Sequence, residues 1–147
     1  MSKGMFDVNG LVKGIRKKQA TINRNSKKLK SAPKYITVGW DASSGKYPER
    51  PEISVSYVAY LHEHGTKDFP AKNMIETTVF LHEDQWVKLY RKLAKKSLSK
   101  GQVPDYYTIA ETVGEQMKRD LENYIYAIDL VDTQRLANSV IVRYSRR

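Results

Sequence analysis

The chain has 147 residues, no cysteine and a formal net charge of +10 at pH 7. This length fits one domain with one modest core, and the lack of cysteine excludes a disulfide framework, a thiolate metal site and a cysteine nucleophile. The charge is uneven, because residues 1–34 hold ten Lys and Arg against Asp7 alone, which leaves +9 there and +1 in the rest. Such a basic segment attracts an anionic partner: a nucleic acid, an acidic protein surface or a neighbouring subunit.

Neither a secretory signal nor a membrane span is predicted. The first ten residues, MSKGMFDVNG, contain no apolar stretch. The apolar runs 36–38 and 57–61 are far shorter than the ~20 residues that cross a bilayer. We therefore expect a soluble protein that is made inside a cell.

The first predicted element is a basic helix over about residues 7–30. Apolar residues recur on one side of it at helical spacing: Leu11, Ile15, Ile22 and Leu29. This stripe is thin, and Asn and Ser residues within the segment disfavour a helix interior. We therefore expect the helix to gain its order by packing on another surface. Its basic residues are the candidate positions for facing DNA or an acidic partner: Lys13, Arg16, Lys17, Lys18, Arg24, Lys27, Lys28 and Lys30.

Two strands are predicted next. Residues 34–40, KYITVGW, and residues 52–61, EISVSYVAYL, both alternate in the manner of strands. We expect these two strands to pair with each other antiparallel. Residues 41–51, DASSGKYPERP, are rich in Gly, Ser and Pro, which predicts an exposed loop between them. A loop of this length often carries a binding role.

The segment His62–Lys72, HEHGTKDFPAK, invites interpretation as a metal site. In an extended chain His62 and His64 would point to one side and Glu63 to the other, and zinc requires at least three protein ligands. We therefore interpret the histidines as surface or interface residues and the segment as a strand end followed by a turn at Gly65. Glu63 is expected to hold the loop through backbone N–H groups or to meet a basic residue of a neighbour.

The remainder is predicted to be mainly helical. A long helix over residues 73–99 starts at Asn73, where Glu76 follows at capping-box spacing. A second helix runs from about Pro104 to Ala127, and its apolar residues recur every four positions. A short turn or helix over 133–138 and a strand over 139–144 follow. The order α–β–β–α–α–β indicates one α+β domain over residues 1–147, in which a small, mostly antiparallel sheet packs with the helices.

No motif for catalysis is found. Gly-x-Ser-x-Gly does not occur, Ser43 and Ser44 have no nearby histidine in the sequence, and the scattered glycines form no phosphate-binding loop. We therefore expect no enzyme, no catalytic residue, no metal and no cofactor.

Two kinds of binding protein remain. The basic helix is compatible with a basic, non-specific nucleic-acid-binding module, since clustered Lys and Arg neutralise phosphates. However, no aromatic residues are interleaved with these charges, and no helix-turn-helix, zinc-finger or RNP signature occurs. The ten tyrosines favour a protein that binds other proteins, because tyrosine is enriched in interfaces.

Three blocks of the sequence resemble a known family. The first is Tyr57–Thr66, YVAYLHEHGT, which is followed by Phe69–Met74, FPAKNM. The others are Ile109–Gly114, IAETVG, and Leu130–Val140, LVDTQRLANSV. In this order and at these spacings, they resemble the neck proteins of tailed bacteriophages, the head–tail joining or tail-completion proteins. The resemblance covers about residues 50–145 and leaves the basic segment outside it.

The resemblance implies a structural virion protein without catalytic residues, assembled in the cytoplasm of a host bacterium. It would form a ring in the phage neck, sixfold or twelvefold with six preferred, that joins the head connector or adaptor to the tail terminator or tube. Genomic DNA would pass through its lumen, and no membrane would be involved. The loops 41–51 and 64–72 and the basic helix are expected to contact neighbours. The interface residues expected in or beside the loops are Tyr47, Arg50, Tyr60, Glu63, His64, Gly65, Thr66, Phe69 and Lys72.

Overall fold

The computed structural model describes residues 8–130 and 133–146, with side chains in the first helix described from residue 12. Its helices are α1 (Val8–Ser31), α2 (Val55–His64), α3 (Met74–Ser99), α4 (Tyr106–Ala127) and α5 (Thr133–Asn138). Its strands are β1 (Tyr35–Gly39), β2 (Lys46–Tyr47), β3 (Arg50–Ser54) and β4 (Ile141–Ser145). The fold class is α+β, as predicted. Asp7, the Leu11 side chain, Val131 and Asp132, which figure in the predictions above, lie outside the described part of the chain.

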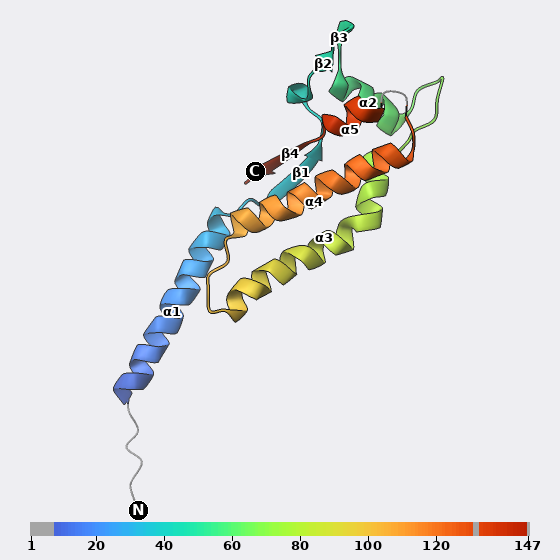
Figure 1. Cartoon of the computed structure of the whole chain (residues 1–147). Helices are drawn as coiled ribbons and strands as arrows, with labels where there is room; N and C mark the ends of the chain where they lie inside the picture. Colours follow the sequence, from blue (N-terminus) through green and yellow to red (C-terminus); the bar gives the residue numbers. More distant parts are fainter. Residues whose placement is uncertain (1–7, 131–132, 147) are drawn as a thin grey trace, which may run out of the picture.

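Helix α4 is the centre of the body and lies between α3 and the β1–β4 sheet (Figure 1). Its predicted apolar stripe is buried at Ile109, Val113, Leu121 and Ile125. The Asp105 carboxylate caps its first turn by accepting from the Thr108 N–H at 3.3 Å, and this helix N-cap accounts for the sharp start of the helix.

A glycine allows α4 to approach the sheet. A Cβ at Gly114 would lie 2.5 Å from the Tyr144 hydroxyl and 2.8 Å from a Val142 methyl. The side of β4 that carries Val142 and Tyr144 is therefore the side that packs on α4.

The main core is formed where α2, α4, α5 and the start of α3 meet. Its buried members are apolar: Val55, Ala59, Met74, Leu121, Ile125, Leu130, Leu136, Ala137 and Val140. Burying a side chain of the Val, Leu or Ile type stabilises the fold by about 1.5–3 kcal/mol. A smaller cluster, made of Ala32, Tyr106 and Ile109, lies where the end of α1 meets α4.

The predicted second strand, residues 52–61, is wrong from Val55 onwards, because residues 55–61 belong to α2. β3 ends at Ser54, whose hydroxyl accepts from the Tyr57 N–H at 3.2 Å and caps α2. The alternating pattern continues to Tyr57, three residues beyond the real strand. However, Val55 and Ala59 are four apart and share the buried face of a helix. Burial of Val55 and Ala59, together with the helix N-cap at Ser54, favours a helix over a strand.

The predicted pairing of the first two strands is also wrong. β1 pairs antiparallel with β4, in the register Tyr35↔Ser145 and Val38↔Val142. β3 pairs instead with β2, within the stretch 41–51 that was predicted to be a loop, and a short 3₁₀ helix over Ala42–Ser44 precedes this hairpin. A strand can pair with a neighbour in the sequence, as β3 does with β2, or with a distant segment, as β1 does with β4. Local alternation does not specify which partner a strand takes.

Helix α1 extends away from the body and meets it only near its C-terminal end (Figure 1). The Tyr106 hydroxyl lies 2.8 Å from Asn25 Oδ1, and the Arg146 guanidinium donates to the Ser31 carbonyl at 2.6 Å. None of the described helices combines the length and apolarity that a membrane span requires.

Candidate interaction surfaces

Glu63 joins two helices. It lies near the end of α2, and its carboxylate accepts from the N–H groups of Ile75 at 2.9 Å and Glu76 at 3.3 Å, in the first turn of α3. A negative charge at this position also interacts favourably with the helix dipole. Of the two predicted roles for Glu63, holding backbone N–H groups is confirmed. The predicted cap at Asn73 is wrong, because this residue has a left-handed backbone and its side chain makes no capping bond.

The loop between these helices is closed by its own backbone. The N–H of Lys72 donates to the carbonyl of His62 at 2.7 Å, and Thr66 Oγ1 accepts from the N–H groups of Asp68 and Phe69. Gly65 has a φ of 75°, and a Cβ there would lie 2.5 Å from the backbone nitrogen of Ala71. The turn at Gly65 is therefore confirmed, and only glycine fits it.

The two histidines of the segment 62–72 face different neighbours. α2 continues through both residues, so their side chains point in different directions, unlike in the extended chain considered above. The His64 ring lies 4.5 Å from that of Tyr60, and the His62 ring lies 5.3 Å from that of Phe69. Burial, and secondly the charge of Lys72, lower the pKa of His62. Within residues 8–130 and 133–146, no group of three His, Cys, Asp or Glu could hold a metal ion.

A groove of about 380 Å³ lies beside the Glu63 joint. Apolar residues of three elements line its floor: Val38, Trp40, Ala59 and Ile75. Polar and aromatic side chains line the rest of it: Asp41, Tyr60, Glu63, His64 and Arg143. An apolar floor with a polar rim can accept an apolar side chain of a partner protein.

One edge of this groove is fixed by an ion pair. Arg143 Nη2 lies 2.8 Å from Asp41 Oδ2, which links β4 to the start of the β2–β3 hairpin. Hydrogen bonds from Ser43, and next the bond from Arg143, lower the pKa of Asp41. This pair was not predicted, because its members are 102 residues apart in the sequence.

The expected interface residues of the hairpin have different environments. Tyr47 is half-buried beneath the guanidinium of Arg135, which lies 5.1 Å from the ring centroid. Arg50 is exposed, at the start of β3. Tyr47 thus ties the hairpin to α5, while Arg50 is the more accessible of the two to a partner.

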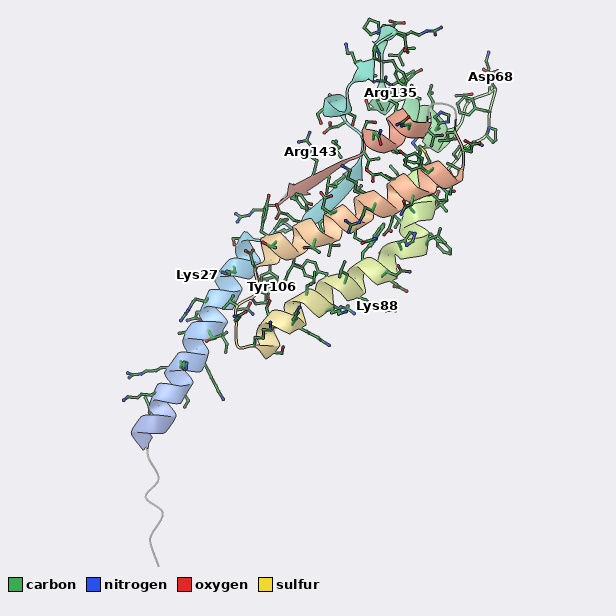
Figure 2. The ribbon with its side chains drawn as sticks, in the orientation of Figure 1. Lys27, Asp68, Lys88, Tyr106, Arg135 and Arg143 are labelled. Atoms are coloured by element: carbon green, nitrogen blue, oxygen red, sulfur yellow. The ribbon has the colours of Figure 1, made fainter. Side chains whose placement is uncertain are left out.

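The predicted site residues lie on three separate parts of the molecule. The joint and its loop bring together Tyr60, Glu63, His64, Gly65, Thr66, Phe69 and Lys72, and Asp68 lies at the loop tip (Figure 2). The hairpin carries Tyr47 and Arg50. The eight basic residues are all exposed on α1, at the other end of the body from the loop (Figures 1 and 2). They form a surface of their own.

One exposed aromatic residue was not predicted to be a contact. Phe80 is the most exposed large apolar residue of the described chain, with 85% of its surface accessible. It lies away from the side of α3 that is buried at Met74, Thr78 and Trp86. Its position away from the buried side was the available signal. The neighbouring Leu81 is exposed as well, and contiguous exposed apolar residues mark contacts with other proteins.

The chain was compared with models of protein families, with curated proteins and with solved structures, and nothing matched. The functional interpretation therefore rests on the residues of this chain.

Proposed function

We propose that this chain is a structural virion protein of a tailed phage. It forms a ring in the neck, of six or twelve subunits, between the head connector and the tail terminator or tube, and DNA passes through the lumen. Its role is mechanical: it completes an interface and lets the tail attach. The proposal assigns it no catalytic residue, metal or cofactor.

The exposed apolar stripe of α1 is the observation that carries the proposal of an assembly component. Ile15, Ile22 and Leu29 keep 57%, 59% and 54% of their surface accessible on a helix that stands away from the body. An isolated helix gains little stability in water, and helices in proteins are stabilised mainly by packing of an apolar face. A surface supplied by another subunit would cover this stripe.

The residues that carry the family resemblance support the same proposal in another way. Glu63 and Gly65 build the joint between α2 and α3, and Leu136 and Val140 belong to the main core. These blocks therefore serve the scaffold. The groove, the hairpin tip and α1 remain accessible to partners, as a ring subunit with neighbours on several sides requires.

A stop codon placed in the gene within its phage tests the neck role. We expect filled heads and separate tails, and joined particles again when the protein is supplied from a plasmid. Electron microscopy of the complemented particles should then place the protein in the neck. Joined, infectious particles made without the protein would refute the proposal.

A nucleic-acid-binding module is the second candidate, because residues 8–31 contain eight basic and no acidic residues. The affinity of the isolated protein for duplex DNA, titrated with salt, separates the two functions. Tight binding by the monomer, with log K falling by about 0.9 per log unit of salt for each phosphate contacted, favours this candidate. Weak binding that is independent of α1 favours the neck ring.

A further inference from the structure

The first half of α3 carries a face that combines carboxylates with apolar side chains. Five residues that fall on one side of the helix form this face, which we name the acidic face of α3: Glu76, Phe80, Glu83, Asp84 and Val87. Residues 74–87 contain no Lys or Arg. Three of the five residues are acidic, and Phe80 and Val87 are apolar. The face therefore offers both negative charge and a surface for packing.

The acidic face has no partner within the described chain. Phe80 is the most exposed large apolar residue there, and Val87 is also exposed. The carboxylates of Glu83 and Asp84 are exposed and form no hydrogen bond or ion pair with a described residue. An exposed aromatic ring among unpaired charges of one sign marks a contact with a basic, apolar surface.

A groove continues this face towards the body. It measures about 580 Å³ and lies between β1, α3 and α4, where Glu83 and Val87 form one wall and Tyr35 and Tyr90 are among the other lining residues. Arg91 and Lys34 also line it, so a basic partner is favoured only along the first half of α3.

The complementary surface is α1 of the same sequence. Ile15 and Ile22 are seven residues apart, and Lys18 lies between them on the same side of the helix, whereas Lys17 points towards the opposite side. Phe80 and Val87 have the same seven-residue separation, with Glu83 and Asp84 between them. Seven residues span about 10 Å of helix, and helices with apolar residues at this spacing pack side by side at a shallow angle.

We propose that α1 of one copy packs on the acidic face of α3 of a second copy. Ile15 and Ile22 cover Phe80 and Val87 and reach the groove, and Lys18, which lies on the same side of α1, meets the partner's carboxylates. The contact buries the exposed stripe of α1 and neutralises unpaired charges on both helices. It specifies where neighbouring subunits of the assembly touch.

The geometry of the chain requires a second copy. α3 begins beside α2, at the end of the body opposite to α1 (Figure 1), so α1 does not meet the acidic face of its own chain. Pairing of two α1 helices is disfavoured, because each carries eight positive charges and no negative one within residues 8–31. The contact is therefore heterologous, and such contacts close into rings or continue as open chains.

This inference deepens the proposed function and rests on it only for the closure of the assembly into a ring. The contact itself is a property of the purified protein. Its test is independent of the phage experiment, so the two proposals can fail separately.

Charge reversal on each surface, followed by mixing, tests the contact. We expect the full-length protein to self-associate with rising concentration in analytical ultracentrifugation at low salt. Lys17→Glu/Lys18→Glu should weaken association by about tenfold or more, and Glu83→Lys/Asp84→Lys should do the same. An equimolar mixture of the two variants should associate again, because the glutamates on α1 of one variant then meet the lysines on α3 of the other.

Matched variants control for net charge. Lys95→Glu/Lys96→Glu, near the C-terminal end of α3, changes the charge as the α1 variant does, and Glu111→Lys/Glu115→Lys changes it as the α3 variant does. Both pairs are exposed and lie outside the two surfaces, so association should be retained. Circular dichroism confirms that all variants are folded.

Three outcomes would overturn the inference: a wild-type protein that stays monomeric up to its solubility limit, a mixture that does not associate, or control variants that lose association equally. Duplex DNA distinguishes the other role of α1. If Lys17→Glu/Lys18→Glu weakens only DNA binding and leaves self-association unchanged, α1 faces nucleic acid and the contact is wrong.

Discussion

Helices α1 and α4 have similar lengths, 24 and 22 residues, but opposite relations to the rest of the chain. α4 buries seven residues between α3 and the sheet, whereas no side chain of α1 from residue 12 to 31 is buried. Both show helical periodicity in the sequence. Periodicity therefore reveals an apolar face but does not tell which surface covers it. The apolar face of α4 is covered within the chain, whereas that of α1 is exposed among the described residues.

The same substitution in the two helices should give the largest contrast. Leu121 in α4 is 1% exposed and Leu29 in α1 is 54% exposed. Leu121→Ala should lower the free energy of unfolding by about 2–5 kcal/mol, because it leaves a cavity in the core. Leu29→Ala should change it by less than about 0.5 kcal/mol. Urea denaturation of dilute protein, followed by tryptophan fluorescence, measures both. Equal losses would show that α1 packs on its own body.

Two helical glycines give a second, smaller contrast. Gly114→Ala should destabilise the protein by about 1–3 kcal/mol, because the new methyl would overlap Tyr144 and Val142. Nothing lies within 4 Å of a Cβ at Gly14 in α1, so Gly14→Ala should favour local helix by up to about 1 kcal/mol. Urea midpoints report the first effect and circular dichroism the second. If Gly114→Ala left the urea midpoint unchanged, α4 would not pack on the sheet as closely as described.

The helices could be predicted from the sequence because their evidence is local. The stripe of α4 specifies a helix by itself, and α1 and α3 lie close to their predicted bounds. Residues 133–138, predicted as a turn or helix, form the helix α5. The second strand was mistaken because the alternation around Val55 also fits the first turn of a capped helix. The local pattern favoured a strand, whereas burial of Val55 together with Ala59 favours the helix.

The features that could not be predicted depend on residues distant in sequence. β1 finds its partner about 100 residues away, in β4, and Glu63 caps a helix that begins eleven residues later. The acidic face of α3 was missed because its importance depends on which side of the helix α4 covers. The resemblance did indicate Glu63 and Gly65, and both proved to shape the joint.

Glu63 itself offers the next prediction, of intermediate size. Glu63→Ala removes the acceptor for two N–H groups at the start of α3 and should cost about 1–2 kcal/mol of stability. Asp68→Ala, at the exposed loop tip, should cost less than about 0.5 kcal/mol. Thermal or urea unfolding measures the difference. Glu63→Ala should also impair assembly more than His62→Ala/His64→Ala does. The reverse order would make a metal site worth testing again.

The smallest predicted effect is a pH dependence that belongs to the body and not to α1. The pKa of His62 lies below its ordinary value of 6.5, mainly because of burial, so the unfolded chain takes up this proton at a higher pH than the folded one. The neutral ring therefore supports the fold fully above about pH 6.5, and this contribution declines as the pH falls through that value towards the lower pKa of the folded state. Residues 8–31 contain neither an acidic residue nor a histidine, so they add no such titration of their own. Urea midpoints at a series of pH values should fall less steeply for His62→Gln than for the wild type. Equal slopes would mean that the folded chain leaves His62 as easily protonated as the unfolded chain does, and that the packing of its ring on Phe69 does not restrict it.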